Sequence, residues 1–179
     1  MNFVVFDLEA TCWQGKREGR NETIEIGAVL VNEHMQIVSE FEQFVKPVTN
    51  PILSDFCIEL TSIQQSDVDS APDFKEAINY FKEWFGYPDE DHLLCSWGFY
   101  DRKQLESDCG LHGLDTQWIE QHISLKHQYT QIAGLRRHVG MKGALYREGF
   151  DLEGTHHRGI DDARNIAKIF VKYFEEWSR

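Results

Sequence analysis

The sequence predicts an α/β fold in which a mixed five-stranded sheet is flanked by helices. Three β-rich runs follow one another between residues 3 and 45, and the rest of the chain alternates short apolar runs with amphipathic stretches. Consecutive strands with short connections pair antiparallel, whereas strands separated by helices pair parallel. An initial antiparallel meander followed by such units therefore makes a mixed sheet covered by helices.

The first three strands form the predicted meander. Residues 3–6, Phe-Val-Val-Phe, are an apolar run that stops at Asp7, which suits a buried strand with a carboxylate at its carboxyl end. Residues 23–31 and 36–45 are β-rich and alternate apolar with polar positions. The turn-forming residues 32–34 lie between them, so the two runs predict a hairpin.

Strands and helices alternate in the remainder of the chain. Between residues 73 and 85, apolar side chains recur at spacings of four, three and four, which is the stripe of an amphipathic helix. The later elements are predicted as a strand at 92–96, a helix at 100–109 stopped by Gly110, a strand at 123–125, a helix at 131–139 ending at Gly140, one or two turns at 142–147 and a long amphipathic helix at 161–177.

Length and composition predict one domain over residues 1–179, because 41% of the residues are hydrophobic and a chain of this size buries a core. The first apolar run ends at Asp7 and has no basic segment before it, so we expect no signal peptide. No stretch approaches the roughly 18 apolar residues of a membrane span. The four cysteines form no C-x-x-C pair, which predicts reduced thiols in a cytoplasmic protein rather than a zinc framework.

The net charge of −12 weighs against a nucleic-acid partner, because such proteins usually carry a basic face. Two features reduce this objection. Carboxylates that hold divalent cations are neutralised in the working protein. Basic residues also gather late in the chain, where we expect a local rim that guides a short strand; they are Arg136, Arg137, Lys142, Arg147, Arg158 and Arg164.

Asp7 and Glu9 are separated by one residue, so on a strand both side chains point to the same face. Like charges so close repel each other unless cations lie between them, and oxygen donors suit Mg²⁺ or Mn²⁺. Taken alone, the pair also fits an ordinary strand end that enters a loop. Asp101, five residues after the strand at 92–96, taken alone fits a helix start, where its charge is favoured by the helix dipole.

His157 precedes the last predicted helix, and Asp162 lies in its first turn. An imidazole titrates near neutral pH, so one standing over a fixed carboxylate can take a proton from water. The plain alternative is a surface histidine beside an aspartate at a helix start. His156 and Asp161 keep the same spacing. The two histidines also suit zinc, but the acidic residues offer mostly oxygen, which favours magnesium.

Three segments together resemble the DEDDh exonuclease superfamily, which has the ribonuclease H-like fold. They are Phe-Asp-Leu-Glu-Ala-Thr near the amino terminus, Trp-Gly-x-x-Asp in the middle and His-x-x-x-x-Asp before the last helix. Their order and separations are those of the superfamily, from Phe6 to about Ile169. The strings DLEATCW, SDFCIELTSIQQSDVD, SWGFYDRKQL and HHRGIDDARNIA are similar to the histone-mRNA and RNA-interference exonucleases and to bacterial sporulation-inhibitor-like exonucleases.

The resemblance implies a 3′→5′ exonuclease that uses two Mg²⁺ or Mn²⁺ ions to release nucleoside 5′-monophosphates from single-stranded RNA or DNA. It implies His157 as the general base and, as metal ligands, Asp7, Glu9, Asp101 and Asp162. His157 and Asp162 are preferred to their neighbours because a small residue follows the family's aspartate, as Ala163 follows Asp162.

The same resemblance places the terminal nucleotide beside Ala10, Thr11, Phe56, Leu60, Thr61, Trp97 and His157. Phe56 and Leu60 equally suit core packing, and Trp97 also suits a buried structural role. The eukaryotic members carry extra RNA-binding segments, whereas we expect a bare catalytic domain here. Three alternatives stay open: a proofreading or repair exonuclease acting on DNA, a non-catalytic nucleic-acid-binding protein of the same fold, and a phosphodiesterase acting on very short oligonucleotides.

Overall fold

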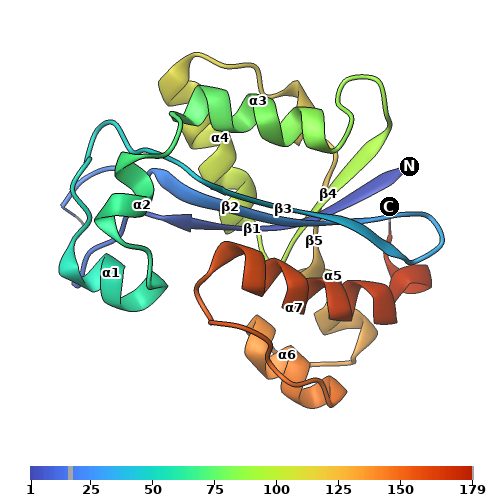
Figure 1. Ribbon diagram of the computed structural model, residues 1–179. Helices are drawn as coiled ribbons and strands as arrows, with labels where there is room; N and C mark the ends of the chain where they lie inside the picture. Colours follow the sequence, from blue (N-terminus) through green and yellow to red (C-terminus); the bar gives the residue numbers. More distant parts are fainter. Residues whose placement is uncertain (16–17, 179) are drawn as a thin grey trace.

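The protein is described by a computed structural model that covers residues 1–15 and 18–178. Its centre is a five-stranded sheet with the strand order β3-β2-β1-β4-β5 (Figure 1). β1 pairs antiparallel with β2 and β2 with β3, whereas β4 is parallel to both β1 and β5. The predicted mixed sheet with an initial meander is confirmed. The strands are β1 (Asn2–Ala10), β2 (Thr23–Val31), β3 (Ile37–Phe44), β4 (His92–Ser96) and β5 (His122–Ser124).

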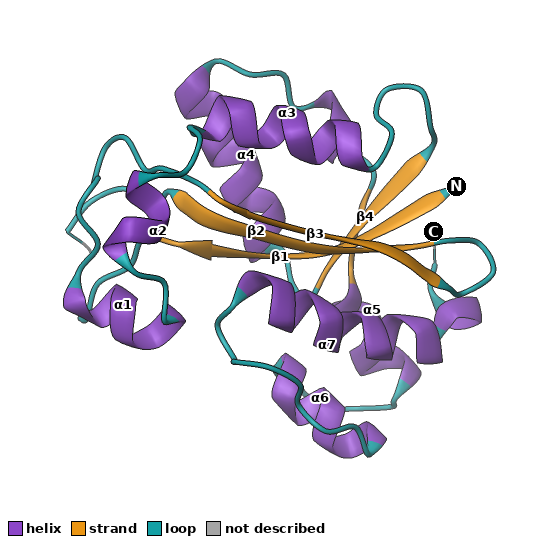
Figure 2. Ribbon diagram, in the orientation of Figure 1, coloured by secondary structure: helices purple, strands orange, loops and turns teal. Residues whose placement is uncertain are grey.

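Helices cover both faces of this sheet (Figure 2). α3 and α4 lie on one face, and α5, α6 and α7 lie on the other, while α1 and α2 stand beyond the carboxyl end of β1. No helix in the described ranges has the length and apolar character to cross a bilayer. The helices are α1 (Asp55–Thr61), α2 (Gln65–Asp69), α3 (Phe74–Trp84), α4 (Tyr100–His112), α5 (Leu125–Ile132), α6 (Met141–Glu148) and α7 (Gly159–Lys172), with 3₁₀ turns at Gln117–Ile119 and Phe174–Glu176.

β1 contributes to two hydrophobic cores because it is covered on both faces. Phe3 and Val5 pack with residues of α5, α6 and α7, whereas Val4 and Phe6 pack with residues of α3 and α4. Since successive strand residues point to opposite faces, a strand buried on both sides is apolar throughout. The central strand is therefore held firmly from both sides.

α7 approaches the sheet very closely where it crosses β2. A Cβ atom on Gly27 would lie 2.0 Å from the Gly159 carbonyl carbon and 2.0 Å from the Ile160 nitrogen. A Cβ on Gly159 would in turn lie 3.1 Å from the carbonyl oxygen of Asp7. The two glycines therefore let the first turn of α7 lie directly against β1 and β2.

The predicted helix at 131–139 is wrong. α5 ends at Ile132, and residues 133–140 form a loop. Gly134 has φ 62°, its N–H donates to Gln131, and the next N–H, of Leu135, donates to Thr130. This is the hydrogen-bond pattern of a Schellman motif, in which a glycine in the left-handed region ends a helix.

Other boundaries also differ from the prediction. α4 continues past Gly110 to His112, and Gly113, with φ 63°, ends it. β5 stops at Ser124 because Leu125 begins α5, and the last helix begins at Gly159 and ends at Lys172, before a separate 3₁₀ turn. β1 runs on to Ala10, so the first carboxylates lie inside the strand rather than at its end.

Candidate active site

A cavity of about 530 Å³ opens beside the carboxyl end of β1, the loop after β4 and the start of α7. In α/β folds, ligands commonly bind where the carboxyl ends of parallel strands meet. All five residues predicted to be catalytic line this cavity: Asp7, Glu9, Asp101, His157 and Asp162.

Three of the acids converge closely. Asp7 and Glu9 point to the same side of β1, and Asp162 joins them from the first turn of α7. Each of the three offers a carboxylate oxygen, and these oxygens lie within 4.8 Å of one another. Asp101 stands in the first turn of α4, where its Oδ1 accepts a hydrogen bond of 3.2 Å from the backbone N–H of Leu8. β1 thus anchors the fourth carboxylate as well.

Burial and mutual repulsion oppose ionisation of these acids. Burial raises the pKa of Asp7 well above 3.8, and the charges of Asp101, Glu9 and Asp162 raise it further. Burial and the neighbouring carboxylates, Glu25 first, raise the pKa of Glu9 to about 9. Burial also raises the pKa of Asp101 to about 6. Acids so arranged are ionised together only when cations lie among them, and an all-oxygen donor set fits Mg²⁺ or Mn²⁺.

Two stacked imidazoles stand over Asp162. The ring centroids of His156 and His157 are 3.9 Å apart. His156 Nδ1 lies 3.0 Å from the carboxylate of Asp162, and the backbone N–H of His157 donates to the same carboxylate at 3.1 Å. These three residues also lie close enough to hold an ion. Burial, together with the charges of His156 and Lys142, lowers the pKa of His157, which favours the neutral imidazole that a general base requires.

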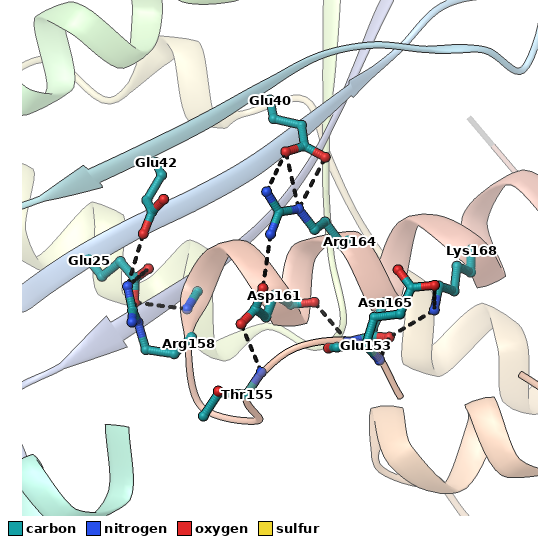
Figure 3. A network of polar contacts seen from close by, with 11 residues as sticks. Glu25, Glu40, Glu42, Glu153, Thr155, Arg158, Asp161, Arg164, Asn165 and Lys168 are labelled. Atoms are coloured by element: carbon teal, nitrogen blue, oxygen red, sulfur yellow. Dashed lines mark hydrogen bonds and ion pairs between the residues drawn. The ribbon is translucent and has the colours of Figure 1, made fainter. Parts of the chain in front are cut away.

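Asp161 is excluded from the cavity although its spacing from His156 matches that of the predicted pair. Its carboxylate accepts a hydrogen bond of 2.8 Å from the backbone N–H of Thr155 and pairs with Arg164 at 2.9 Å (Figure 3). The structure therefore brings Asp162, and not Asp161, to the other acids.

An ion pair holds the segment that carries His157 against β2. Arg158 pairs with Glu25 at 3.2 Å and with Glu42 at 2.9 Å, and Glu25 also accepts a hydrogen bond of 2.9 Å from the N–H of Gly159 (Figure 3). Arg164 pairs with Glu40 at 2.6 Å. Because acidic side chains already hold these two arginines, neither is available to the basic rim that the sequence predicted.

The residues predicted to contact the terminal nucleotide are only partly brought together. Of the seven, Trp97 and His157 line the cavity. Trp97 is buried, and its Nε1 donates to the carbonyl of Val139 at 3.1 Å. The other five lie outside the cavity lining in the described part of the chain: Ala10, Thr11 and Thr61 are buried, and Phe56 and Leu60 are half-buried on α1.

Sequence reasoning gave no role to Tyr100 and Lys126, which line the cavity, whereas it had placed Lys142 in the basic rim. Tyr100 lines it beside Asp101 and is 56% exposed, so it offers the accessible ring that was expected of Trp97. Lys126 and Lys142 add two positive charges to a lining rich in acids. The available signal was their position: Tyr100 immediately precedes an acid of the site, and Lys126 follows the end of the fifth strand by two residues.

Comparisons with known proteins identify the family. Residues 4–170 match the model of the exonuclease family RNase_T. The Homo sapiens 3′-5′ exoribonuclease 1 is 33% identical over 181 residues, which cover 96% of this chain and 52% of that protein. The Homo sapiens ERI1 exoribonuclease 2 is 33% identical over 204 residues, which cover 97% of this chain and 28% of that protein. The chain thus spans about a quarter to a half of the length of these curated relatives.

A solved structure is similar over almost the whole chain. It is the nuclease domain of 3′hExo, a DEDDh family member, bound to rAMP; the TM-score is 0.92 at 32% identity, covering 98% of this chain and 92% of that chain. The fold is therefore ribonuclease H-like, and the resemblance to DEDDh exonucleases that the three motifs indicated is confirmed. The matched residues 4–170 contain the whole acidic cluster and both histidines, and the chain belongs to the RNase_T exonuclease family.

Proposed function

We propose that this chain is a 3′→5′ exonuclease that hydrolyses the last phosphodiester of a single strand with the help of two divalent cations. The observation that carries the proposal is the convergence of three carboxylates within 4.8 Å, with a fourth carboxylate and an imidazole in the same cavity. Residues 1–179 act as one exonuclease domain in this proposal, and the free state of all four cysteines supports a reducing, cytoplasmic location.

The acids and the histidine have different roles. Asp7, Glu9, Asp101 and Asp162 would hold the two ions, consistent with the divalent-metal dependence of the DEDDh family to which the similar nuclease domain belongs. When bound, Mg²⁺ or Mn²⁺ lowers the pKa of the attacking water and stabilises charge on the leaving oxygen. His157 takes the proton from that water, because its lowered pKa keeps the imidazole neutral. Cleavage at the last phosphate releases nucleoside 5′-monophosphates.

The substrate class is proposed from the relatives. Two relatives that are 33% identical to this chain are named exoribonucleases, which favours RNA 3′ ends over DNA. The terminal base packs against Tyr100, whose ring is exposed in the cavity, since an aromatic face stacks on any base without reading sequence. His157 and Trp97 complete the contacts with the terminal nucleotide that the cavity offers.

The test uses single-stranded RNA and DNA of the same sequence, labelled at either end, with Mg²⁺, Mn²⁺ or EDTA. We expect 5′-labelled strands to shorten one nucleotide at a time, 3′-labelled strands to release mononucleotides, and EDTA to stop both. Asp7→Ala and His157→Ala should each lose activity by more than about a hundredfold, since even residues that only support metal ligands often contribute ten- to a hundredfold. Lys75→Gln, on α3 across the sheet, is the control.

Three outcomes would contradict the proposal: activity that persists in EDTA, full activity of the Asp7→Ala protein, or strand binding without any mononucleotide release. Faster digestion of DNA than of matched RNA would overturn the RNA preference alone and leave the exonuclease proposal in place.

A further inference from the structure

A row of three rings lies beside the catalytic cavity. The ring centroids of Phe99 and His127 are 4.8 Å apart, and those of His127 and His138 are 4.4 Å apart. We call Phe99, His127 and His138 the ring row. They come from three separate segments, the loop after β4, the helix α5 and the loop before α6. Phe99 stands between two cavity-lining residues, and His127 directly follows the lining residue Lys126.

The ring row is accessible and held in position. Phe99 is 43% exposed, His138 is exposed and His127 is half-buried. His127 Nδ1 lies 2.6 Å from the Ser124 hydroxyl, and His138 Nδ1 lies 2.8 Å from the Thr130 hydroxyl. Phe99 and His127 are tilted by 37° and the two histidines by 61°, so the exposed faces of Phe99 and His138 are separate surfaces on which a base can pack. The histidine rings that line the row are already held, so they lose little conformational entropy when a base packs against them.

Four basic residues without an ion pair in the described ranges adjoin the ring row along the chain or line the neighbouring cavity. In the described part of the chain, no ion pair is formed by Lys126 or Lys142, which line the cavity, or by the exposed Arg136 and Arg137 of the loop between α5 and α6. Burial lowers the pKa of His127, and the neighbouring His138 and Lys126 lower it further. This local group of basic residues contrasts with the whole chain, whose net charge is −12.

We propose that the ring row is a second base-binding subsite, which takes a nucleotide upstream of the terminal one while the nearby cations face the phosphates between them. Single-stranded nucleic acid is the partner that fits, because its base faces are free to stack and its backbone is anionic. A duplex would bury those faces in its own stack. This inference rests on the proposed function, since the metal-binding acids define which nucleotide is terminal.

The first experiment keeps the wild-type protein and changes the strand. A single abasic nucleotide is moved through positions two to five from the 3′ end of an eight-nucleotide strand, and kcat/KM for release of the terminal nucleotide is measured with Mn²⁺. We expect one or two neighbouring positions to lose roughly tenfold or more, as loss of base stacking on an aromatic ring typically does. A loss that is the same at all positions, or absent at all, would overturn the subsite.

The second experiment removes rings. For each of the variants Phe99→Leu and His138→Ala, kcat/KM is measured on two substrates: the full strand and the p-nitrophenyl ester of thymidine 5′-monophosphate. The ratio of the first value to the second should fall roughly tenfold in each variant. The ester carries no upstream base, so a merely structural defect would lower both substrates and leave the ratio unchanged. Tyr80→Leu removes an exposed ring on α3, across the sheet, and is the matched control.

Combining the two experiments makes the assignment specific. In the Phe99→Leu protein, an abasic nucleotide at the sensitive position should cost much less than in the wild type, because both changes remove the same contact. Fully additive losses would overturn the subsite. The proposed function fails in a different way: the wild-type protein would then release no mononucleotide from intact strands. If intact strands are digested normally but the position of the abasic nucleotide makes no difference, only the second subsite is contradicted.

Discussion

The guanidinium of Arg158 forms ion pairs with two glutamates that differ in burial. Comparing these two pairs shows how burial changes the contribution of an ion pair to stability. Arg158 pairs with both Glu25 and Glu42, but the side chain of Glu25 is 0% exposed and that of Glu42 is 44% exposed. A buried carboxylate is stabilised only by its partners, whereas an exposed one is also solvated by water. Glu25 additionally accepts from the N–H of Gly159, so it joins β2 to the beginning of α7.

We therefore expect unequal costs from removing the two carboxylates. Glu25→Ala should lower the free energy of unfolding by about 3 kcal/mol, because it breaks a buried pair and leaves Gly159 without its acceptor. Glu42→Ala should cost less than about 1 kcal/mol, as exposed pairs do. Urea unfolding at saturating Mg²⁺ measures both, since bound cations suppress the repulsion between Glu25 and Glu9. Equal costs would refute this account of the pair.

The lowered pKa of His157 determines where activity should be lost as the pH falls. Burial and the charges of His156 and Lys142 lower its pKa from 6.5. A base must be neutral, so a lowered pKa preserves activity as the pH falls through 6.5, and activity is lost only at lower pH. The acid limb of kcat/KM at saturating Mn²⁺ should therefore have its midpoint below 6.5. A midpoint above 6.5, or an unchanged limb in the His157→Ala protein, would rule out this role.

Features of the helices and strands that follow from residue periodicity were predicted from the sequence. Features that depend on contacts within the folded chain were not. Asp7 and Glu9 share a face because strands repeat every two residues, and this held although β1 is longer than expected. The short helices α1 and α2 were not predicted, because so few residues carry little helical period. Gly134 and Gly140 both suit a helix end, and only the hydrogen bonds of the folded chain select the first.

The choice between neighbouring aromatic residues shows the same limit within the site. Trp97 and Tyr100 both lie between the end of β4 and the acid Asp101. No single period applies across the passage from strand to loop to helix, so the sequence does not show which of the two rings in the cavity lining is accessible. The folded chain buries Trp97 through its hydrogen bond to Val139 and leaves Tyr100 exposed.

We expect the close crossing of α7 over β2 to be needed both for stability and for the position of the acids. Gly27→Ala should destabilise the protein by about 3 kcal/mol or more and impair metal-dependent activity, because its Cβ would meet the backbone of Gly159 at 2.0 Å and push α7 away from β1. Gly143→Ala, inside α6, is the control: its Cβ would lie 3.6 Å from Val139, an ordinary contact.

The control variant should be unchanged or more stable by up to about 1 kcal/mol, since alanine favours a helix interior over glycine. Chemical denaturation gives both stabilities, and Mn²⁺ titration of activity reports the position of Asp162. If Gly27→Ala matched Gly143→Ala in both measurements, the close crossing would have no role in placing the site.

At the scale of the whole molecule, two cores stabilise a site that opposes folding when no metal is bound. The hydrophobic cluster on one face of the sheet packs β1 against α7, and the cluster on the other face packs β1 against α3 and α4. β1 and α7 are the elements that bring three carboxylates within 4.8 Å of one another. The favourable packing of the cores therefore offsets the repulsion among the acids. In this way the fold keeps the functional site in an arrangement that is unfavourable by itself.

The stability of the whole molecule should consequently depend on pH in a way that metal abolishes. The folded pKa of Glu9 is about 9 against an ordinary 4.5, and that of Asp101 is about 6 against 3.8. A raised folded pKa means that the folded chain holds protons that the unfolded chain has released. The stability associated with these groups is therefore complete below pH 4 and is lost as the pH rises toward 9. Between pH 6.5 and 8.5, Asp101 has largely titrated, and the loss should come from Glu9 together with Asp7, whose pKa is also raised well above its usual value.

In EDTA, we expect the melting temperature to fall by on the order of 5 °C from pH 6.5 to 8.5, given how a few kcal/mol shift the melting of a domain of this size. With saturating Mn²⁺ the fall should vanish, because the cations take the place of the protons and bind deprotonated carboxylates best. Glu9→Gln should make the fall in EDTA clearly smaller, because glutamine does not ionise and the substitution also removes one of the charges that raise the pKa of Asp7. Calorimetric scans of both proteins, with and without Mn²⁺, test this. Parallel pH profiles in EDTA and Mn²⁺ would mean that the acidic cluster neither opposes folding nor binds the ions.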